Sequence, residues 1–254
     1  MKAILPAAGY ATRLQPLTLN TPKALLQVGP KKMVEHVIHA LETIDDIDEI
    51  HIVTNEKFYQ NFVEWNSNFK SSKTIILHND GTKSNEDRLG TLGDIHFVLE
   101  QADIKDDCII INADNLFEFS LKDMCAFFKE KKGPSVAVLD LEDPSLLANK
   151  FGTILSDENG RIIDFEEKPA QPKSSLAATG VYMYTADCMD RLRALAGNPE
   201  NKAFCDKSGH FIQHLMDFKP VYAYAFKEKW YDVGSHDDLR EAHKRYGGGT
   251  EYDE

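Results

Sequence analysis

The chain has 254 residues, with 29 Lys and Arg against 41 Asp and Glu, so its formal net charge is −12. This length predicts a single domain that can bury a sizeable core, and 42% hydrophobic with 28% charged residues is typical of a soluble globular protein. The acidic balance argues against nucleic acid or an anionic membrane as a partner, because both are bound through basic surfaces.

The cysteines and the N-terminus indicate the compartment. The four cysteines are widely spaced and include no CxxC pair, which favours free thiols in a reducing environment. The apolar run at residues 3–5 is too short for the core of a signal peptide, and no window has the apolar length of a membrane span. We therefore expect a cytoplasmic protein without a membrane partner. The sequence leaves open whether the chain forms a homo-oligomer.

The first half of the chain alternates strand and helix patterns. Short apolar runs predict strands at residues 3–5, 50–53, 74–77 and 108–111. Apolar residues at helical spacing predict helices at residues 33–41, 58–65, 95–99 and 121–131. The segment from Gly9 to Pro30 lacks periodicity and predicts a long functional loop. This alternation predicts an α/β fold, a Rossmann-like, doubly wound, mostly parallel sheet with helices on both faces.

The second half is richer in short β-type runs. They lie at residues 136–139, 152–155, 162–165 and 181–184, and Asn159-Gly160 predicts a hairpin turn. A helix at 189–195, a strand at 221–225 and a helix at 237–243 are expected to close the chain. We predict one domain over residues 1–246, with an α/β half (1–134), a β-rich part (135–235) and a closing helix (236–246). Residues 247–254 are expected to form a disordered tail.

The loop after the first strand is the first candidate site. Small residues in Leu5-Pro-Ala-Ala-Gly would let backbone N–H groups approach a nucleotide, and Arg13 and Lys23 carry positive charge for its phosphates. The alternative is a tight turn whose two cations face solvent. The loop is neither a P-loop nor a dinucleotide fingerprint, because it lacks Gly-Lys-Ser/Thr and Gly9 has no glycine partner at the required spacing.

Three acidic segments are further candidates. Asp114 directly follows the most apolar strand, at the edge of a parallel sheet where ligands bind, and suits Mg²⁺ with nucleotide phosphates. Its alternative role is a helix N-cap or an Asx turn. Glu167 and Lys168 could bind sugar hydroxyls and a phosphate, or mark an exposed strand end. Asp232 is either a second metal carboxylate or an acidic residue in a turn.

Together these segments resemble the sugar-phosphate nucleotidyltransferases, the family of nucleotide-sugar pyrophosphorylases. Seven stretches carry the resemblance in order and span nearly the whole chain. They are LPAAGYATRLQPLTLNTPKALLQV from Leu5, RLGTLGDI from Arg88, INADNLF from Ile111, FGTI from Phe151, FEEKPAQPKS from Phe165, ATGVYMY from Ala178 and WYDVGSHDDL from Trp230.

The resemblance implies a reaction and a set of site residues. The phosphate of a sugar 1-phosphate would attack the α-phosphorus of a nucleoside triphosphate, giving an NDP-sugar and pyrophosphate. The first half would then bind the nucleotide, through Leu5, Ala7, Ala8, Gly9, Thr12, Gly90 and Thr91. Catalytic cations would be Arg13, Lys23 and Lys168, converging on one pocket. Asp114 and Asp232 would hold Mg²⁺. The sugar phosphate would contact Asn115, Gly152, Glu167, Thr179 and Gly180.

Two departures from the family pattern leave alternatives open. Ala11 and Ala113 stand where many relatives have glycine, and the Ala-Asp-Asn form at Asp114 also resembles choline-phosphate cytidylyltransferases. A cytidylyltransferase acting on choline phosphate is therefore one alternative. A catalytically silent nucleotide-sugar-binding subunit is another, although all five charged residues with expected roles are present. Hexapeptide repeats are absent, so we expect no appended β-helix and no acetyltransferase function.

Overall fold

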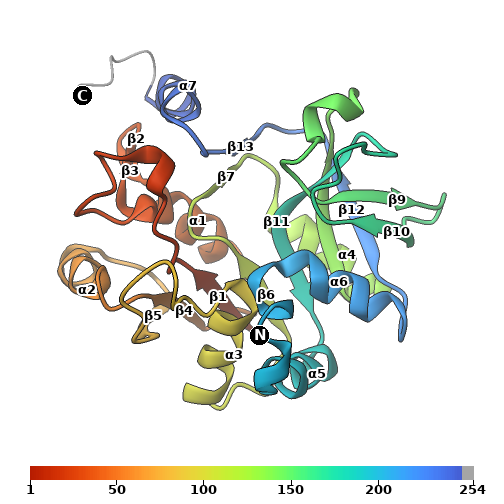
Figure 1. The fold of residues 1–254 in the computed structure, drawn as a ribbon, viewed down its shortest axis with the longest axis horizontal. Coiled ribbons are helices and arrows are strands. Elements are labelled where there is room, and N and C mark those ends of the chain that lie inside the picture. Colours follow the sequence, from red (N-terminus) through yellow and green to blue (C-terminus); the bar gives the residue numbers. More distant parts are fainter. Residues whose placement is uncertain (248–254) are drawn as a thin grey trace.

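A nine-stranded sheet runs through the computed structural model, which describes residues 1–247 (Figure 1). One path through it has the order β10-β9-β11-β6-β1-β4-β5, while β8 pairs with both β11 and β12. The strands are β1 (Lys2–Pro6), β4 (Glu49–Thr54), β5 (Thr74–Asn79), β6 (Cys108–Ile111), β8 (Ser135–Asp140), β9 (Thr153–Ser156), β10 (Ile162–Glu166), β11 (Leu176–Tyr184) and β12 (Tyr222–Phe226). Of the tail expected at residues 247–254, residues 248–254 lie outside the described residues.

The sheet is parallel in its first half and mixed in its second. Strands β6, β1, β4 and β5 pair in parallel. Strand β11 then runs antiparallel to β6 and to β8 and β9, so the β-rich part of the chain continues the same sheet. The predicted hairpin is confirmed, because β9 and β10 pair antiparallel around Gly160, whose φ is +77°.

Helices cover both faces of the sheet. On one face, Ala3 and Leu5 of β1 pack in a core with α1 (Met33–Glu42), α2 (Tyr59–Asn68) and α4 (Leu121–Lys131). The alternate residue Ile4 points to the other face and packs with α3 (Thr91–Gln101), α5 (Ala186–Ala196) and α6 (Ser208–Met216). The sheet is therefore doubly wound, as the sequence predicts.

Small elements complete the site end of the fold. Strands β7 (Asn115–Phe117) and β13 (Trp230–Asp232) form a two-stranded sheet, and β2 (Gln27–Val28) pairs with β3 (Lys31–Lys32). Helix α7 (His236–Tyr246) packs in a third core cluster with β2 and with Leu116 of β7. Short 3₁₀ helices lie at η1 (Thr12–Leu14), η2 (Lys23–Leu25), η3 (Pro144–Leu147), η4 (Pro199–Asn201) and η5 (Phe204–Asp206).

Side-chain caps explain where two of the helices begin. The hydroxyl of Ser120 accepts a hydrogen bond from the N–H of Asp123 at the start of α4, and Ser235 accepts one from Asp238 at the start of α7. Helix α4 ends at Lys132, which adopts a left-handed conformation with φ +51°.

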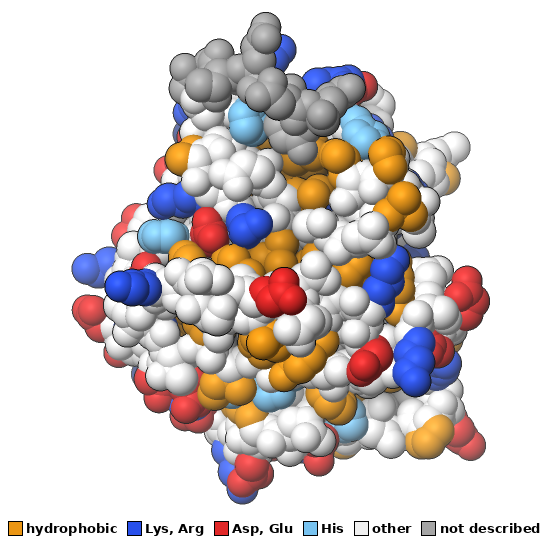
Figure 2. Space-filling view, turned by 90° about the vertical axis from the view of Figure 1, so that its left-hand side faces the viewer, with side chains coloured by type: hydrophobic (Ala, Val, Ile, Leu, Met, Phe, Trp, Pro, Cys, Tyr) orange, Lys and Arg blue, Asp and Glu red, His pale blue; other side chains and the backbone are white. Residues whose placement is uncertain are grey.

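The surface carries charges of both signs. On the face formed by β2, β3 and α2, Figure 2 shows acidic and basic side chains interspersed with hydrophobic ones, without one sign covering the face. Among residues 1–247, no helix combines the length and the apolar character that crossing a membrane requires.

Candidate active site

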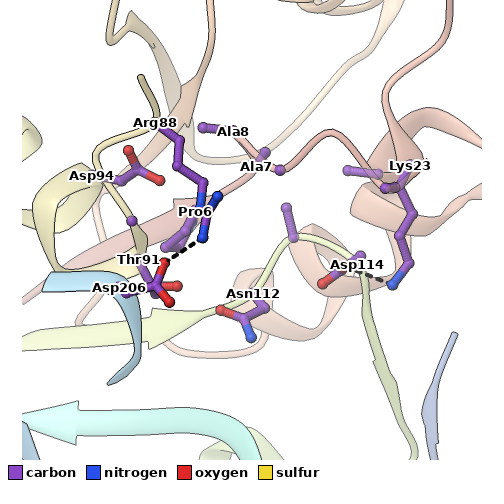
Figure 3. A pocket seen from close by; sticks show the side chains of 15 residues that line it. Pro6, Ala7, Ala8, Lys23, Arg88, Thr91, Asp94, Asn112, Asp114 and Asp206 are labelled. Carbon is purple, nitrogen blue, oxygen red and sulfur yellow. Dashed lines mark hydrogen bonds and ion pairs between the residues drawn. The ribbon is translucent and has the colours of Figure 1, made fainter. Parts of the chain in front are cut away.

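Two adjoining cavities lie at the carboxyl ends of the parallel strands. The first cavity has a volume of about 320 Å³ and is lined by the loop after β1, the starts of η2 and α3, and the turn after β6 (Figure 3). The second has a volume of about 220 Å³ and is lined by β11, the loops beside β9 and β10, the start of α6, and β13. Both are lined by Thr91, Asn112, Asp114 and Asp206. The turn after β6 is therefore the junction between them.

The end of β4 holds the loop after β1 in place. The N–H of Ala7 donates to Val53 O at 2.8 Å, and Thr54 Oγ1 donates to Ala7 O at 3.2 Å. The side-chain amide of Asn55 donates to Ala8 O at 2.8 Å. These contacts present Ala7, Ala8 and Gly9 to the first cavity as a wall of small residues, where the backbone can approach a ligand closely.

Lys23 and Asp114 meet at the junction of the cavities. The two side chains form an ion pair, with Lys23 Nζ 2.8 Å from Asp114 Oδ2. Lys23 begins η2, whose Ala24 and Leu25 are buried and anchor it. Asp114 lies in a turn closed by a 3.0 Å hydrogen bond from Asn115 N to Asn112 O. Burial lowers the pKa of Lys23, but the charges of Asp114 and Asp232 outweigh it and raise the pKa above its ordinary value.

Asp232 reaches the same place from the far end of the chain. Pairing of β13 with β7 sets Asp232 opposite Asn115, one residue from Asp114. Its side chain opens onto the second cavity, which Lys168 also lines. Desolvation by the surrounding walls raises the pKa of Asp232 and the charge of Asp114 adds to this, whereas Lys23 and Lys168 lower it. Two carboxylates and two ammonium groups thus interact at the junction.

The two carboxylates fit a magnesium site that a substrate completes. Among residues 1–247, no group of three or more His, Cys, Asp or Glu side chains could hold a metal by itself. Mg²⁺ is commonly held by one or two carboxylates together with substrate phosphates, so Asp114 and Asp232 suffice. Desolvation, and to a smaller extent the charge of Asp114, raises the pKa of Asp232, and a bound cation would favour the charged form of both carboxylates.

The residues expected to contact the sugar phosphate line the second cavity, and some of their side chains form hydrogen bonds within the protein. The side chain of Asn115 is buried; it donates to Thr179 O and accepts a 2.7 Å hydrogen bond from Trp230 Nε1. Thr179 Oγ1 donates to Ala137 O at 2.9 Å. Gly180 has φ +75°, and a Cβ there would lie 2.9 Å from Asn112 Nδ2. Asn115 and Gly180 therefore fasten β7 and β11 around the cavity.

Glu167 and Lys168 form another wall of the second cavity. Both follow β10 directly, and Lys168 has a left-handed backbone with φ +51°. A Cβ on Gly152 would lie 2.7 Å from the ring of Phe165 and 3.5 Å from Glu167 Oε2. The glycine therefore makes room for the Phe165 ring beside the carboxylate.

Some expected residues lie away from the cavities. Leu5 is fully buried in the core of β1, and Thr12 and Arg13 are exposed in η1. None of the three lines either cavity, so Lys23 and Lys168 converge on the junction without Arg13.

The cavities also contain residues that the sequence reasoning did not single out. Those in the first are Arg88 and Asp94, those in the second are Lys150, Lys207, Ser208 and Trp230, and both contain Asn112 and Asp206. Arg88 Nη2 pairs with Asp206 Oδ1 at 2.9 Å across the rim of the first cavity (Figure 3). The stretch of sequence beginning at Arg88 and the polar residue after β6 were the available signals for Arg88, Asp94 and Asn112.

Comparison with known proteins agrees with this geometry. The model of the nucleotidyl transferase family matches residues 2–248, nearly the full chain. The chain belongs to this family. It shares 28% identity over 238 residues with a candidate mannose-1-phosphate guanyltransferase of Sulfolobus acidocaldarius, covering 92% of this chain and 60% of that protein. With the bifunctional protein GlmU of Methanocaldococcus jannaschii it shares 29% identity, covering 96% and 54%. The chain thus spans between half and two thirds of the length of these relatives.

Solved structures with the nucleotidyl transferase fold superpose along the whole chain. A candidate glucose-1-phosphate thymidylyltransferase of Bacillus anthracis, in complex with sucrose, has a TM-score of 0.80 and 25% identity, covering 100% of this chain and 98% of that one. A UDP-glucose pyrophosphorylase complexed with UDP-glucose has a TM-score of 0.79 and 23% identity, covering 98% and 99%. At 23% identity, the second likeness concerns the fold alone.

Proposed function

We propose that the protein joins a nucleoside triphosphate and a sugar 1-phosphate to give an NDP-sugar and pyrophosphate. The observation that carries the proposal is the position of Asp114, which lines both cavities and pairs with Lys23 where they meet. A triphosphate in the first cavity and an acceptor phosphate in the second would meet beside Asp114, Lys23 and Asp232.

The reaction needs no protein nucleophile, because the attacking phosphate oxygen is already anionic. That oxygen forms a bond to the α-phosphorus, and the bond from the α-phosphorus to the oxygen bridging the β-phosphorus breaks, so pyrophosphate leaves with the electron pair. The protein must bring two anions together and neutralise the charge that develops. Lys23 serves this purpose on the nucleotide side, and Lys168 binds the acceptor phosphate.

Asp114 and Asp232 would hold Mg²⁺ together with the triphosphate. When bound, the ion would neutralise phosphate charge at the α-phosphorus. The ammonium group of Lys23 would then contact both Asp114 and the phosphates. Glu167 would accept hydrogen bonds from sugar hydroxyls, and the backbone at Gly90 and Thr91 would contact the base.

A phosphorylated amine such as choline phosphate is the second candidate acceptor. The rings of Phe151 and Trp230 lie 5.0 Å apart at an interplanar angle of 64° in the second cavity, which Glu167 also lines. Aromatic faces beside a carboxylate suit a quaternary ammonium group as well as a sugar ring.

A substrate matrix tests the proposal. Each of five triphosphates (ATP, GTP, CTP, UTP and dTTP) is incubated with sugar 1-phosphates or choline phosphate and Mg²⁺, while pyrophosphate release is followed and the product is weighed by mass spectrometry. We expect one or more NDP-sugars, loss of turnover in EDTA and recovery on adding Mg²⁺. Inactivity across the whole matrix would favour a silent binding subunit, and a choline product alone would favour the second candidate.

Two substitutions test the residue roles. Lys23→Ala and Lys168→Ala should each lower kcat/KM by about 100-fold or more, because each removes a cation next to the reacting phosphates. Lys105→Ala is the matched control, since within residues 1–247 Lys105 pairs only with exposed Asp103, in the loop ahead of β6, at the end of the strand away from the cavities. Near-normal turnover in Lys168→Ala would refute its role.

A further inference from the structure

A buried carboxyl group lies in the wall of the first cavity. Asp94, on the first turns of α3, is only 6% exposed and lines the cavity. The carboxyl group of Asp80, which follows β5, lies close enough for its charge to act on Asp94. Asp94 Oδ1 and Asp80 Oδ2 are buried, and among residues 1–247 neither has a hydrogen-bond partner.

The surroundings of Asp94 favour the protonated form of its carboxyl group. Burial, and then the charge of Asp80, raises the pKa of Asp94 well above its ordinary value. Asp80 is held in place by Thr82, whose N–H and Oγ1 donate to Asp80 Oδ1 at 2.7 and 2.8 Å. Of the two carboxyl groups, Asp94 is the one that borders the cavity.

The position of Asp94 argues against contact with the phosphates. Figure 3 shows Asp94 on the side of the cavity opposite to Lys23 and Asp114. Phosphate groups belong beside Lys23, and an acidic pair would repel them. A nucleotide with its phosphates at Lys23 would extend its base toward Gly90, Thr91 and Asp94, which line the other side.

We propose that Asp94, supported by Asp80, selects a nucleobase that carries an exocyclic amino group. The inference rests on the proposed function and adds the class of base. A carboxyl oxygen accepts a hydrogen bond from the amino group of cytosine, adenine or guanine, whereas it repels the O4 carbonyl that uracil and thymine present in place of the cytosine amino group. A buried acceptor left unpaired by the wrong base penalises that base strongly. CTP, ATP or GTP should therefore be preferred to UTP and dTTP.

The test compares kcat/KM for the five triphosphates in the wild type and in two variants at Asp94. We expect the best amino-bearing triphosphate to exceed UTP and dTTP by at least tenfold in the wild type, and its identity distinguishes the three bases. Asp94→Leu, of similar size without an acceptor, should reduce this ratio to near one. Asp94→Asn should keep it, because the amide can donate to Asp80 and still present an oxygen, as a protonated Asp94 does.

Direct binding separates this inference from the proposed function. Calorimetric titration with CTP, ATP, GTP and UTP in the absence of an acceptor should give the same order of affinity as the kinetics. A wild type that turns over but prefers UTP or dTTP would overturn the inference and leave the function standing. An unchanged ratio in Asp94→Leu would also overturn it. If Asp94→Leu does not fold, Asp94→Ser serves in its place, since its hydroxyl can donate to a carbonyl and should raise relative affinity for UTP.

Discussion

The carboxylate of Glu167 lies directly against the backbone of Gly209 in α6. A Cβ at residue 209 would overlap Glu167 Oε2 and would lie 2.7 Å from the ring of Phe165. Gly209 is the second residue of α6 and is buried. It follows Ser208, whose Oγ lies 3.0 Å from the hydroxyl of Tyr182. This glycine, rather than any side chain, determines how deeply Glu167 can sit in the wall of the second cavity.

We therefore expect Gly209→Ala to weaken acceptor binding selectively. The added methyl group must displace Glu167, and loss of one charge-assisted hydrogen bond to the acceptor should raise the acceptor KM about tenfold. The KM of the nucleoside triphosphate should stay within about twofold, because Glu167 lines the second cavity and not the first. Steady-state kinetics with each substrate varied in turn measure both values. Equal increases in the two KM values would show general damage to the fold instead.

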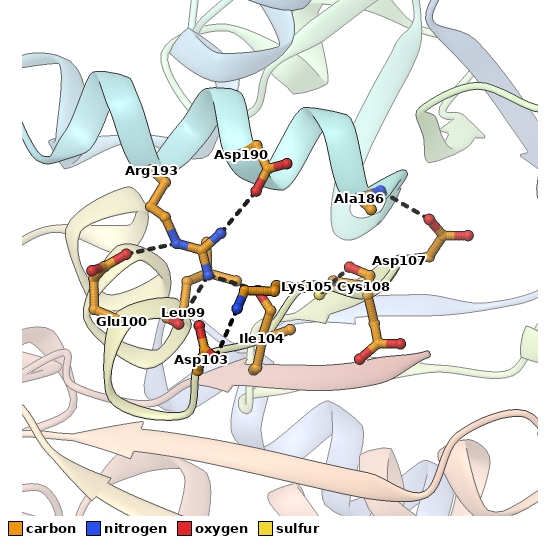
Figure 4. Close-up of polar contacts among 11 residues, drawn as sticks. Leu99, Glu100, Asp103, Ile104, Lys105, Asp107, Cys108, Ala186, Asp190 and Arg193 are labelled. Atoms are coloured by element: carbon orange, nitrogen blue, oxygen red, sulfur yellow. Dashed lines mark hydrogen bonds and ion pairs between the residues drawn. The ribbon is translucent and has the colours of Figure 1, made fainter.

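Arg193 links α5 to the end of α3. Its guanidinium donates to Leu99 O at 3.0 Å and to Ile104 O at 2.6 Å, and it pairs with Glu100 and Asp190 (Figure 4). These carbonyls lie at the end of α3, where helices leave carbonyl groups without partners inside the helix.

Arg193→Ala should destabilise the protein by roughly 2–3 kcal/mol, because Ile104 O and Glu100 lose the donor that Arg193 supplies, whereas Leu99 O keeps the N–H of Ile104 as a donor. Arg193→Lys should recover only part of this, since an ammonium group cannot reproduce the planar fork. Urea unfolding provides the measurement. Lys105→Ala is the control, because its pair with Asp103 is exposed and should contribute little to stability. A loss as small in Arg193→Ala as in this control would contradict the assignment.

Local patterns predicted most of the fold. The strand at residues 108–111 and the helix at 121–131 match the structure, because buried runs and helical periodicity are properties of neighbouring residues. Helix α6 was missed, because its polar start at Ser208-Gly-His leaves only a short apolar face, formed by Phe211, Ile212 and Leu215. Strands β7 and β13 have three residues each and are too short to show a period.

The expected residues that line the cavities follow a strand or stand in one of the stretches that resemble the family. Asp114 was found because it comes directly after the most apolar strand. Arg88 and Asp206 could not be paired from the sequence, because they lie 118 residues apart and meet only through folding. The charge of Arg13 and the family resemblance of its stretch suggested a catalytic role, yet its side chain is exposed in η1. Sequence reasoning therefore finds residues at strand ends, whereas contacts between distant segments require the structure.

The two alanines that replace family glycines should respond oppositely to glycine substitution. Ala11 has φ +43°, a left-handed conformation that costs an alanine roughly 1–2 kcal/mol, so Ala11→Gly should stabilise the protein by roughly 0.5–1 kcal/mol after the entropy of the unfolded chain is deducted. Ala113 is 1% exposed and is not among the residues with positive φ, so Ala113→Gly should destabilise it by about 1 kcal/mol or more. Urea unfolding of both variants measures the difference. If Ala11→Gly does not stabilise the protein, the argument from the backbone conformation of Ala11 is refuted.

Two buried histidines should make the fold sensitive to acid. His51 Nδ1 lies 3.0 Å from His78 Nε2 on neighbouring strands β4 and β5, and the rings are stacked. Burial, and then the charge of His51, lowers the pKa of His78 to about 4 from the ordinary 6.5. Between pH 6.5 and pH 4 the unfolded chain therefore binds a proton at His78 that the folded chain does not bind. The contribution of neutral His78 to the free energy of unfolding is fully present above pH 6.5 and is lost as the pH drops from 6.5 toward 4.

Between pH 7.5 and pH 5 we expect His78 to account for a loss of about 2 kcal/mol in the free energy of unfolding. His78→Gln, which cannot be charged, should lose correspondingly less over the same interval. Asp80 and Asp94, with raised pKa values, act in the opposite direction, but they do so in both proteins and cancel in the comparison. Urea titrations of the two proteins at both pH values measure this difference. Parallel pH profiles would mean that His78 takes up its proton without unfolding, so that a different group must cause any acid sensitivity.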